Sequence, residues 1–247
     1  MTSAQQYLDR RWTALILLCV AQFIVVLDAS IVNVALPSIG KGLHFSERNL
    51  PWVVNAYVIA FGGFLLLGGR AADLLGRRRV FMAGLLVVAG ASLAAGFAAT
   101  QGQLIAARAA QGLGAAIVSP SALSIVTTLF KDGAERNKAL GAWGAVAGSA
   151  GAVGVLLGGI LTEGVGWEWV LWVNVPVALI ALVLTPGLIP ESRSESATRH
   201  FDAVGAVSIT AGLSLLAYAL LDASSAGWGS AKTIGLLAVL SFSTTDC

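Results

Sequence analysis

The feature that most constrains this chain is a series of apolar runs long enough to cross a lipid bilayer. A spanning helix needs about 20 mainly apolar residues, and seven runs reach about that length. Only 11% of the 247 residues are charged, whereas an average soluble domain carries about a quarter. The sequence therefore predicts an all-α membrane protein. The runs cover residues 12–36, 49–69, 79–99, 104–129, 138–162, 168–188 and 203–221, and an eighth run that begins near residue 232 is too short to cross.

The basic residues predict the orientation of these spans. Lys and Arg accumulate in the cytoplasmic loops of membrane proteins. If the N-terminus is cytoplasmic, eleven of the fifteen basic residues fall on the cytoplasmic side, three fall on the other side, and Arg108 lies within a span. We therefore expect a multi-pass protein of the cell membrane with a cytoplasmic N-terminus.

The sequence also argues against several classes of function. A net charge of +2, spread over short loops, provides no basic face for a nucleic acid. Cys19 lies in an apolar run and Cys247 is the last residue, so neither a disulfide framework nor a metal or redox site is expected. His44 and His200 lie in loops on opposite sides without a partner cluster, so we expect neither an enzyme nor a cofactor. The short loops and the lack of a re-entrant filter disfavour a receptor or a channel.

The loop after the second run, GRAADLLGRRR (residues 69–79), combines a tight turn with charge. An ordinary cytoplasmic loop explains the arginines, but it does not require an acid or two glycines at these offsets. The stretch resembles the signature G-x-x-x-D-x-x-G-R-R/K-R/K between helices 2 and 3 of the major facilitator superfamily. The resemblance implies a conformational latch at the cytoplasmic surface, formed by Gly69, Asp73, Gly76, Arg77 and Arg78.

The fourth run carries Arg108 about one turn inside its start, within the stretch RAAQGLG (residues 108–114). A charged side chain in hydrocarbon is costly unless it is paired or hydrated, and snorkelling to the interface is the simplest alternative. The stretch is similar to the R-x-x-Q-G-x-G pattern in helix 4 of the same superfamily. Arg108, Gln111, Gly112 and Gly114 stand at the matching positions.

Glycine dominates the fifth run and recurs there at three- and four-residue spacing. Close helix packing is the physical minimum that such a pattern implies, with Gly148, Gly154, Gly158 and Gly159 as the expected packing residues. The run resembles the antiporter signature of helix 5, which ends G-x-x-x-G-P-x-x-G-G. The stretch GVLLGG (residues 154–159) keeps the terminal glycine pair but has no proline before it, so no proline kink is expected.

Three further stretches narrow the resemblance. The stretch WEWVLWVNVP (residues 167–176) looks like the entry to helix 6, W-R-W-x-F-x-x-N-x-P, with glutamate where arginine is usual. An interfacial aromatic belt explains its tryptophans but not its Asn-x-Pro. Together with LDASIVNVALP (27–37) and WVVNAY (52–57), it resembles the fourteen-helix drug/proton antiporter branch. That branch implies alternating-access export of amphipathic compounds by two six-helix bundles with two helices between them.

The resemblance divides the chain into three parts. Residues 1–189 would form the N-terminal six-helix transmembrane bundle, residues 190–201 a cytoplasmic linker, and residues 202–247 an extra helix with a truncated start of the next. We therefore expect an N-terminal fragment that lacks the C-terminal bundle needed for transport. The alternative is a non-transporting fragment or an exporter of another small metabolite. The expected partners are a small-molecule substrate, protons and membrane lipid, with no nucleic acid.

Asp28 is the acid that lies well inside a fully crossing run. Proton coupling needs a carboxyl group whose pKa can shift as access alternates, since burial raises a carboxyl pKa and a nearby cation lowers it. The first helix runs outward and the fourth inward, which places Asp28 and Arg108 at compatible depths in the outer half of the membrane. We expect these two residues to pair, with Asn33, Asn55 and Gln111 as further proton-coupling or cavity residues. Because helical neighbours fall three or four residues apart, Asp28 and Asn33 should face different surroundings.

Overall fold

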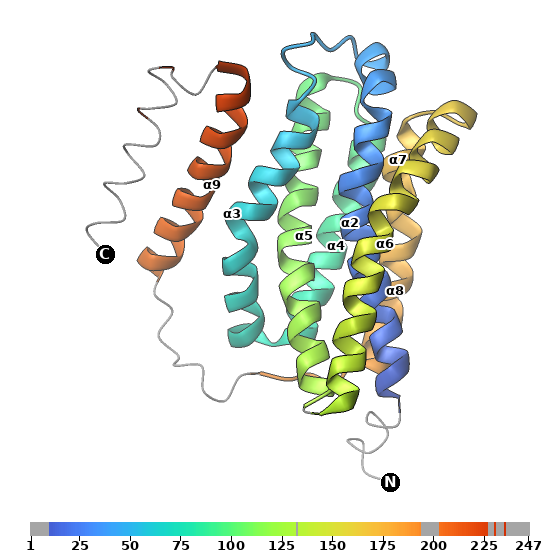
Figure 1. The fold of residues 1–247 in the computed structure, drawn as a ribbon, viewed down its shortest axis with the longest axis vertical. Coiled ribbons are helices and arrows are strands. Elements are labelled where there is room, and N and C mark those ends of the chain that lie inside the picture. Colours follow the sequence, from blue (N-terminus) through green and yellow to red (C-terminus); the bar gives the residue numbers. More distant parts are fainter. Residues whose placement is uncertain (1–9, 132, 194–202, 227–229, 231–234, 236–247) are drawn as a thin grey trace.

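The computed structural model describes residues 10–131, 133–193, 203–226, 230 and 235, and these residues form a bundle of antiparallel helices (Figure 1). Six helical segments are long and apolar enough to cross a membrane, with α7 and α8 counted as one. The described residues contain no strand, and the predicted all-α membrane fold is confirmed. The helices are α2 (Arg11–Gly42), α3 (Trp52–Leu75), α4 (Arg77–Gly96), α5 (Gln101–Leu129), α6 (Ala134–Gly164), α7 (Glu168–Trp172), α8 (Asn174–Leu188) and α9 (Ala203–Ala226).

Two of the predicted spans differ from the observed helices in an informative way. The first was expected to end at residue 36, yet α2 continues through Pro37 to Gly42. The sixth is divided at Val173 into α7 and α8. Pro176 lacks the N–H that would bond to the carbonyl of Trp172, and this missing bond favours a break there. The predicted seventh span corresponds to α9, whereas the eighth lies outside the described residues except for residue 235.

Close approaches between helices depend on glycine at the centre of the bundle. The helix α5 packs against both α3 and α4. A Cβ atom on Gly112 would overlap the carbonyl of Tyr57 on α3, and one on Gly114 would press against Val88 on α4. Both glycines of the RAAQGLG stretch therefore let backbones meet without an intervening side chain, as is typical of membrane helix packing.

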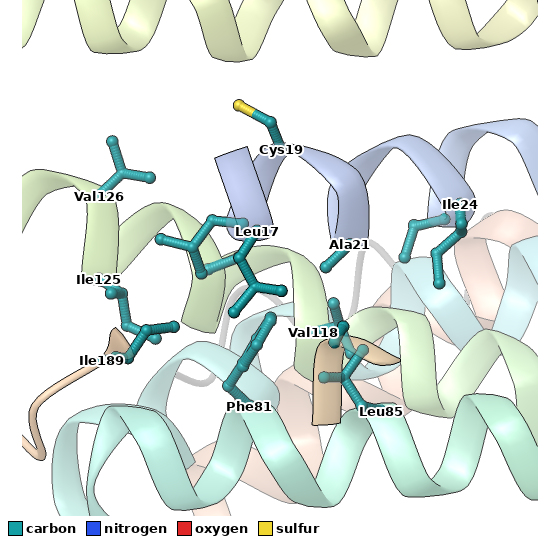
Figure 2. Close-up of a cluster of buried hydrophobic side chains, with 14 of the residues drawn as sticks. Leu17, Cys19, Ala21, Ile24, Phe81, Leu85, Val118, Ile125, Val126 and Ile189 are labelled. Carbon is teal, nitrogen blue, oxygen red and sulfur yellow. The ribbon is translucent and has the colours of Figure 1, made fainter. Parts of the chain in front are cut away.

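Two apolar clusters fill the bundle, one toward each end. Near the end where α2 begins, Phe81 and Leu85 of α4 face Leu17 of α2 and Val118 of α5 (Figure 2). Toward the opposite end, a second cluster joins α2, α3, α4, α5 and α7. Asp28 lies on α2 where these two apolar regions meet, so its polar partners must come from the neighbouring helices. The second cluster includes Leu27, Ile31, Val53, Ala95, Leu104 and Leu171.

The glycines of α6 divide into two faces. Gly154 and Gly158 lie against Ser30 and Val34 of α2, where an added Cβ would be 2.7 Å and 2.9 Å from the respective Cβ atoms. Gly148 and Gly159 have no described heavy atom within 4 Å of an added Cβ, so the packing expected at these two positions has no partner among the described residues. At about 100° per residue, both lie roughly a quarter turn away from Gly158 on the same side.

The helix α9 packs along α3, at the left in Figure 1. A Cβ on Gly63 would overlap the hydroxyl of Ser214, so the two backbones approach closely at this point. Trp52 and Tyr218 stack at the far end of the same contact, with ring centroids 5.8 Å apart. The segment after the linker is therefore held against the bundle by α3.

Candidate functional site

A buried polar network surrounds Asp28, whose exposed fraction is 4%. The carboxylate receives three side-chain donors from two other helices. Arg108 Nη1 donates to Oδ2 at 2.5 Å, while Gln111 Nε2 and Asn174 Nδ2 donate to Oδ1 at 3.2 Å and 2.7 Å. The structure therefore brings together Asp28, Arg108 and Gln111, three of the five residues expected from the sequence, and the expected Asp28–Arg108 pair is present.

The side chain of Arg108 is fully buried by the described residues. Its exposed fraction is 0%, so the snorkelling alternative is wrong. Nε donates to the carbonyl of Val53 at 3.1 Å, and Nη1 also donates to Gln111 Oε1 at 2.9 Å. The guanidinium carbon lies 4.5 Å from the ring centroid of Tyr57, a distance at which cation–π attraction is effective. Nη2 has no hydrogen-bond partner among the described residues.

The local sequence explains how five helices reach one site. Gly112 lets α5 approach α3, and this approach brings the carbonyl of Val53 and the ring of Tyr57 within reach of Arg108. The hydroxyl of Tyr57 donates to the carbonyl of Val25 on α2 at 3.0 Å. From α4, the hydroxyl of Ser92 accepts from Gln111 Nε2 at 2.7 Å. Each charged or amide group is thus oriented by at least one neighbouring helix.

Sequence reasoning missed three members of this network: Ser92, Tyr57 and Asn174. The Asn-x-Pro of the sixth run marked Asn174 as unusual but did not indicate what it contacts. Tyr57 stands in the WVVNAY stretch beside Asn55, which was chosen instead. Nothing in the sequence distinguishes Ser92 from other serines in apolar runs.

The network contains one negative and one positive charge that compensate each other away from water. A buried pair of this kind contributes little net stability, but removal of one partner costs about 3–5 kcal/mol because the other charge is left uncompensated. A proton added to Asp28 would have the same electrostatic effect as such a removal. The arrangement can therefore convert uptake of a proton into a change in the forces between α2, α5 and α8.

Asn33 and Asn55 are not part of this network. Asn33 is exposed, and its Nδ2 donates to the carbonyl of Ala29 on its own helix at 2.7 Å. Both amides line an open pocket of about 350 Å³ between α2 and α3, at the end of the bundle opposite the start of α2. As the five-residue spacing predicted, Asp28 and Asn33 face different surroundings. The remaining lining residues are Leu36, Glu47, Leu50, Pro51 and Val54.

The residues of the predicted latch gather at the turn between α3 and α4. Gly76 has a φ of +108°, a conformation that favours glycine and lets the chain reverse. Arg77 pairs with Asp73 at 3.0 Å and donates to the hydroxyl of Thr128 on α5 at 2.7 Å. Gly69 lies one turn before Asp73, where an added Cβ would be in ordinary contact with Pro120 of α5. The turn is thus connected to α5 by a hydrogen bond and by packing.

Glu191, which follows α8, is a member of this turn that sequence reasoning missed. Its Oε1 accepts from the backbone N–H of Arg78 at 3.2 Å, and its Oε2 lies 3.8 Å and 3.6 Å from the Nε atoms of Arg78 and Arg79. The backbone N–H of Arg77 donates to the carbonyl of Ser192 at 3.0 Å. The start of the linker is therefore fixed to the first turn of α4.

Comparison with known families decides the identity of this arrangement. The sequence profile described as Major Facilitator Superfamily matches residues 18–245. The chain belongs to the major facilitator superfamily. Membership explains the order of the motifs along the chain and establishes a multi-pass membrane protein of a transporter family.

Curated relatives in this superfamily are named for antibiotic resistance and export. The puromycin resistance protein pur8 of Streptomyces alboniger is 47% identical over 92% of this chain and 45% of its own length. The cephamycin export protein CmcT of Amycolatopsis lactamdurans is 46% identical over 93% of this chain and 49% of its own length. The tetracenomycin C resistance and export protein of Streptomyces glaucescens is 36% identical over 98% of this chain and 45% of its own length. The chain spans about half the length of these curated relatives.

Solved structures of a peptide transporter share the fold. A crystal structure of the peptide transporter POT in complex with sulfate superposes with a TM-score of 0.66 at 18% sequence identity. The match covers 95% of this chain and 52% of the transporter. At this identity the likeness supports the helix arrangement alone, and it agrees with one bundle of a two-bundle protein.

Proposed function

We propose that this chain forms the N-terminal bundle of a proton-coupled exporter of drugs or other amphipathic compounds, which works by alternating access. Residues 1–189 form the bundle, residues 190–201 the linker, and residues 202–247 an added helix and the start of another. The relatives named for puromycin resistance and for cephamycin export support the class of substrate. The single observation that carries the proposal is the buried Asp28–Arg108 pair.

Proton exchange at Asp28 is the step that this geometry favours. While Asp28 is ionised, its charge holds α2 to α5 and α8 through Arg108 and Asn174. Uptake of a proton removes that charge, so that the bond of Arg108 to Asp28 weakens, whereas its contacts with the Val53 carbonyl, Gln111 and the Tyr57 ring remain. The weakened attraction allows the helices to move relative to one another. The protein itself catalyses no covalent step in this scheme.

The two ends of the bundle carry different parts of the cycle. The basic end, with the turn between α3 and α4, faces the cytoplasm of the cell membrane, in agreement with the accumulation of Lys and Arg there. The contacts of Arg77 with Asp73 and Thr128 act as the latch that stabilises one access state. The pocket that contains Asn33 and Asn55 contributes to the outward part of the substrate cavity.

Transport requires a second bundle around the central site. We therefore assign export to an assembly in which this bundle is joined to a C-terminal one. In isolation the chain should not move substrate. The alternative, export of another small metabolite, shares the same proton site and differs only in the compound that is carried.

The test is pH-driven dye uptake into inverted membrane vesicles. The chain replaces the matching half of the cephamycin export protein, and the chimera is compared with its Asp28→Asn form and with the chain alone. We expect uptake by the chimera and none by the other two. Glu163→Gln is the matched control, because it makes the same acid-to-amide change at an exposed position. Unchanged uptake by the Asp28→Asn chimera would remove Asp28 from the coupling role, and uptake by the chain alone would refute the need for a second bundle.

A further inference from the structure

Asn174 has an unusual hydrogen-bonding state for a side chain at such depth. Its exposed fraction is 0%, and its Nδ2 donates to Asp28 Oδ1 at 2.7 Å. Its Oδ1 is buried and has no hydrogen-bond partner among the described residues. A buried polar atom without a partner is costly and calls for an explanation. One end of this amide is therefore committed to Asp28 while the other end is unused.

The unused oxygen matters because a neutral Asp28 would need an acceptor. When the carboxylate takes up a proton from water, the new O–H becomes a donor. Arg108 has donors only, and Gln111 Oε1 already accepts from Arg108 at 2.9 Å. Among the three side chains that contact the carboxylate, Asn174 alone has an acceptor with no partner in the described structure. Rotation of its amide by half a turn would place that oxygen where the nitrogen now lies.

The surroundings of Asn174 leave few other groups that can respond to the proton. Among the residues that the structure describes, the charged or titratable side chains in contact with the network are Asp28 of α2, Tyr57 of α3 and Arg108 of α5. The helix α4 contributes the neutral hydroxyl of Ser92. Arg108 keeps its charge at every accessible pH. A change of charge in this network is therefore a change at Asp28.

Asn174 lies at the boundary between α7 and α8, close to α4. Asn174 is the first residue of α8, directly after the break at Val173. On the other side of the break, Trp172 Nε1 donates to the carbonyl of Leu93 at 3.4 Å and the ring packs against Gly96 of α4. Reorientation of the amide would therefore occur at the boundary between α7 and α8, next to the contact of Trp172 with α4.

We propose that Asn174 is a positioning residue that stabilises Asp28 in both protonation states, donating to the carboxylate and accepting from the carboxylic acid after its amide turns over. This inference rests on the proposed function only in that Asp28 exchanges a proton. It adds a residue of α8 to the groups that respond to the charge on Asp28.

The test is an infrared titration of the whole 247-residue chain in lipid nanodiscs, which does not depend on transport. The C=O stretching band of a protonated carboxylic acid is followed from acidic to alkaline pH, and the band of Asp28 is identified by its loss in Asp28→Asn. Asn174→Leu keeps the number and branching of the side-chain heavy atoms but removes the hydrogen bond to Asp28 and the free acceptor. Asn174→Gln keeps the amide, and Thr185→Val is the matched control, since that buried hydroxyl of α8 bonds only to the carbonyl of Ala181 on its own helix.

We expect Asn174→Leu to move the midpoint of this band toward alkaline pH by about one unit, a factor of about ten in proton affinity. The direction follows because a hydrogen bond to a charged group is worth more than one to a neutral group, so the carboxylate loses more than the acid. Asn174→Gln should restore most of the midpoint, and Thr185→Val should leave it unchanged. An Asp28 band that does not move in Asn174→Leu would overturn the role of Asn174 while leaving the proposed function standing. If no band depended on Asp28 at any pH, proton exchange at Asp28 and the role of Asn174 would both be refuted.

A second measurement follows the unsubstituted chain and uses a variant for assignment alone. The side-chain amide resonance of Asn174, assigned by its loss in Asn174→Gln, should shift in nitrogen NMR with the same midpoint as the Asp28 band. A resonance that stays constant while Asp28 titrates would overturn the proposal even if Asn174→Leu failed to fold.

Discussion

Replacement of Arg108 by leucine should destabilise the protein by an amount that depends on pH. The substitution leaves the carboxylate of Asp28, 4% exposed, with only the amides of Gln111 and Asn174 as donors. An uncompensated buried charge of this kind costs about 3–5 kcal/mol. Asp28 can avoid that cost by taking up a proton. In Asp28→Asn the positive charge of Arg108 stays uncompensated at every pH, because the guanidinium cannot lose its proton.

The Arg108→Leu variant can fold by two routes, either with Asp28 charged and uncompensated or with Asp28 protonated. The cheaper route sets the loss of stability. Protonation of an ordinary carboxyl group costs about 3 kcal/mol at about pH 6 and about 6 kcal/mol at about pH 8. At the higher pH the charged route is cheaper, so Arg108→Leu should lose about 3–5 kcal/mol. At the lower pH the loss is limited to about 3 kcal/mol. We therefore expect the destabilisation by Arg108→Leu to be up to about 2 kcal/mol larger at pH 8 than at pH 6. Asp28→Asn should lose the same amount at both.

The assay is equilibrium unfolding of the 247-residue chain in mixed micelles, titrated with sodium dodecyl sulfate and followed by circular dichroism. The wild type, both single variants and the double variant Asp28→Asn/Arg108→Leu are compared at each pH. The double variant leaves no buried charge, so it should be less destabilised than the sum of the two single variants. A loss for Arg108→Leu clearly above about 3 kcal/mol at pH 6, or additive losses in the double variant, would refute the reasoning.

Two further perturbations test the packing and the turn. Gly112→Ala should cost about 1–3 kcal/mol in the same unfolding assay, because the new Cβ overlaps the carbonyl of Tyr57, whereas Gly141→Ala, which meets no described atom within 4 Å, should be neutral or stabilising by up to about 1 kcal/mol. A similar loss at both positions would contradict the close approach of α3 and α5. Glu191→Gln should change stability by less than about 1 kcal/mol, since its ion pairs are partly exposed. It should nevertheless accelerate hydrogen exchange at the backbone amide of Arg78, which loses a charged acceptor. Unchanged exchange there would argue against the hydrogen bond from this amide to Glu191.

The membrane spans and the central pair were predictable because strong physical limits apply to both. Bilayer thickness fixes the length of an apolar helix, so residues 104–129 had to form a span. The cost of an arginine in hydrocarbon required a partner for Arg108, and Asp28 was the acid at a compatible depth. Each of these features depends on a large free energy that few arrangements can satisfy.

The remaining contacts depend on rotation and register, which sequence spacing does not determine. Glycines recur along residues 141–159, but only the three-dimensional position of α2 decides that Gly154 packs and Gly148 does not. The break before Asn174 was hidden within a continuous apolar run. Glu191 looked like one of several charges in a polar linker, and its contact with Arg78 joins residues 113 positions apart. Weak, long-range polar contacts of this type leave little trace in a single sequence.

The distance along the chain between Asp28 and its partners has a consequence for biosynthesis. Arg108 follows Asp28 by 80 residues and Asn174 follows it by 146. At a synthesis rate of about 5–20 residues per second, Arg108 is added about 4–16 s after Asp28 and Asn174 about 7–29 s after it. During that interval α2 has already left the ribosome with an acid near its centre, which opposes membrane insertion by about 2.5–3.5 kcal/mol. The long apolar stretches on either side of Asp28 therefore serve the nascent chain as much as the finished protein, because they must carry the acid through the translocon before any partner exists.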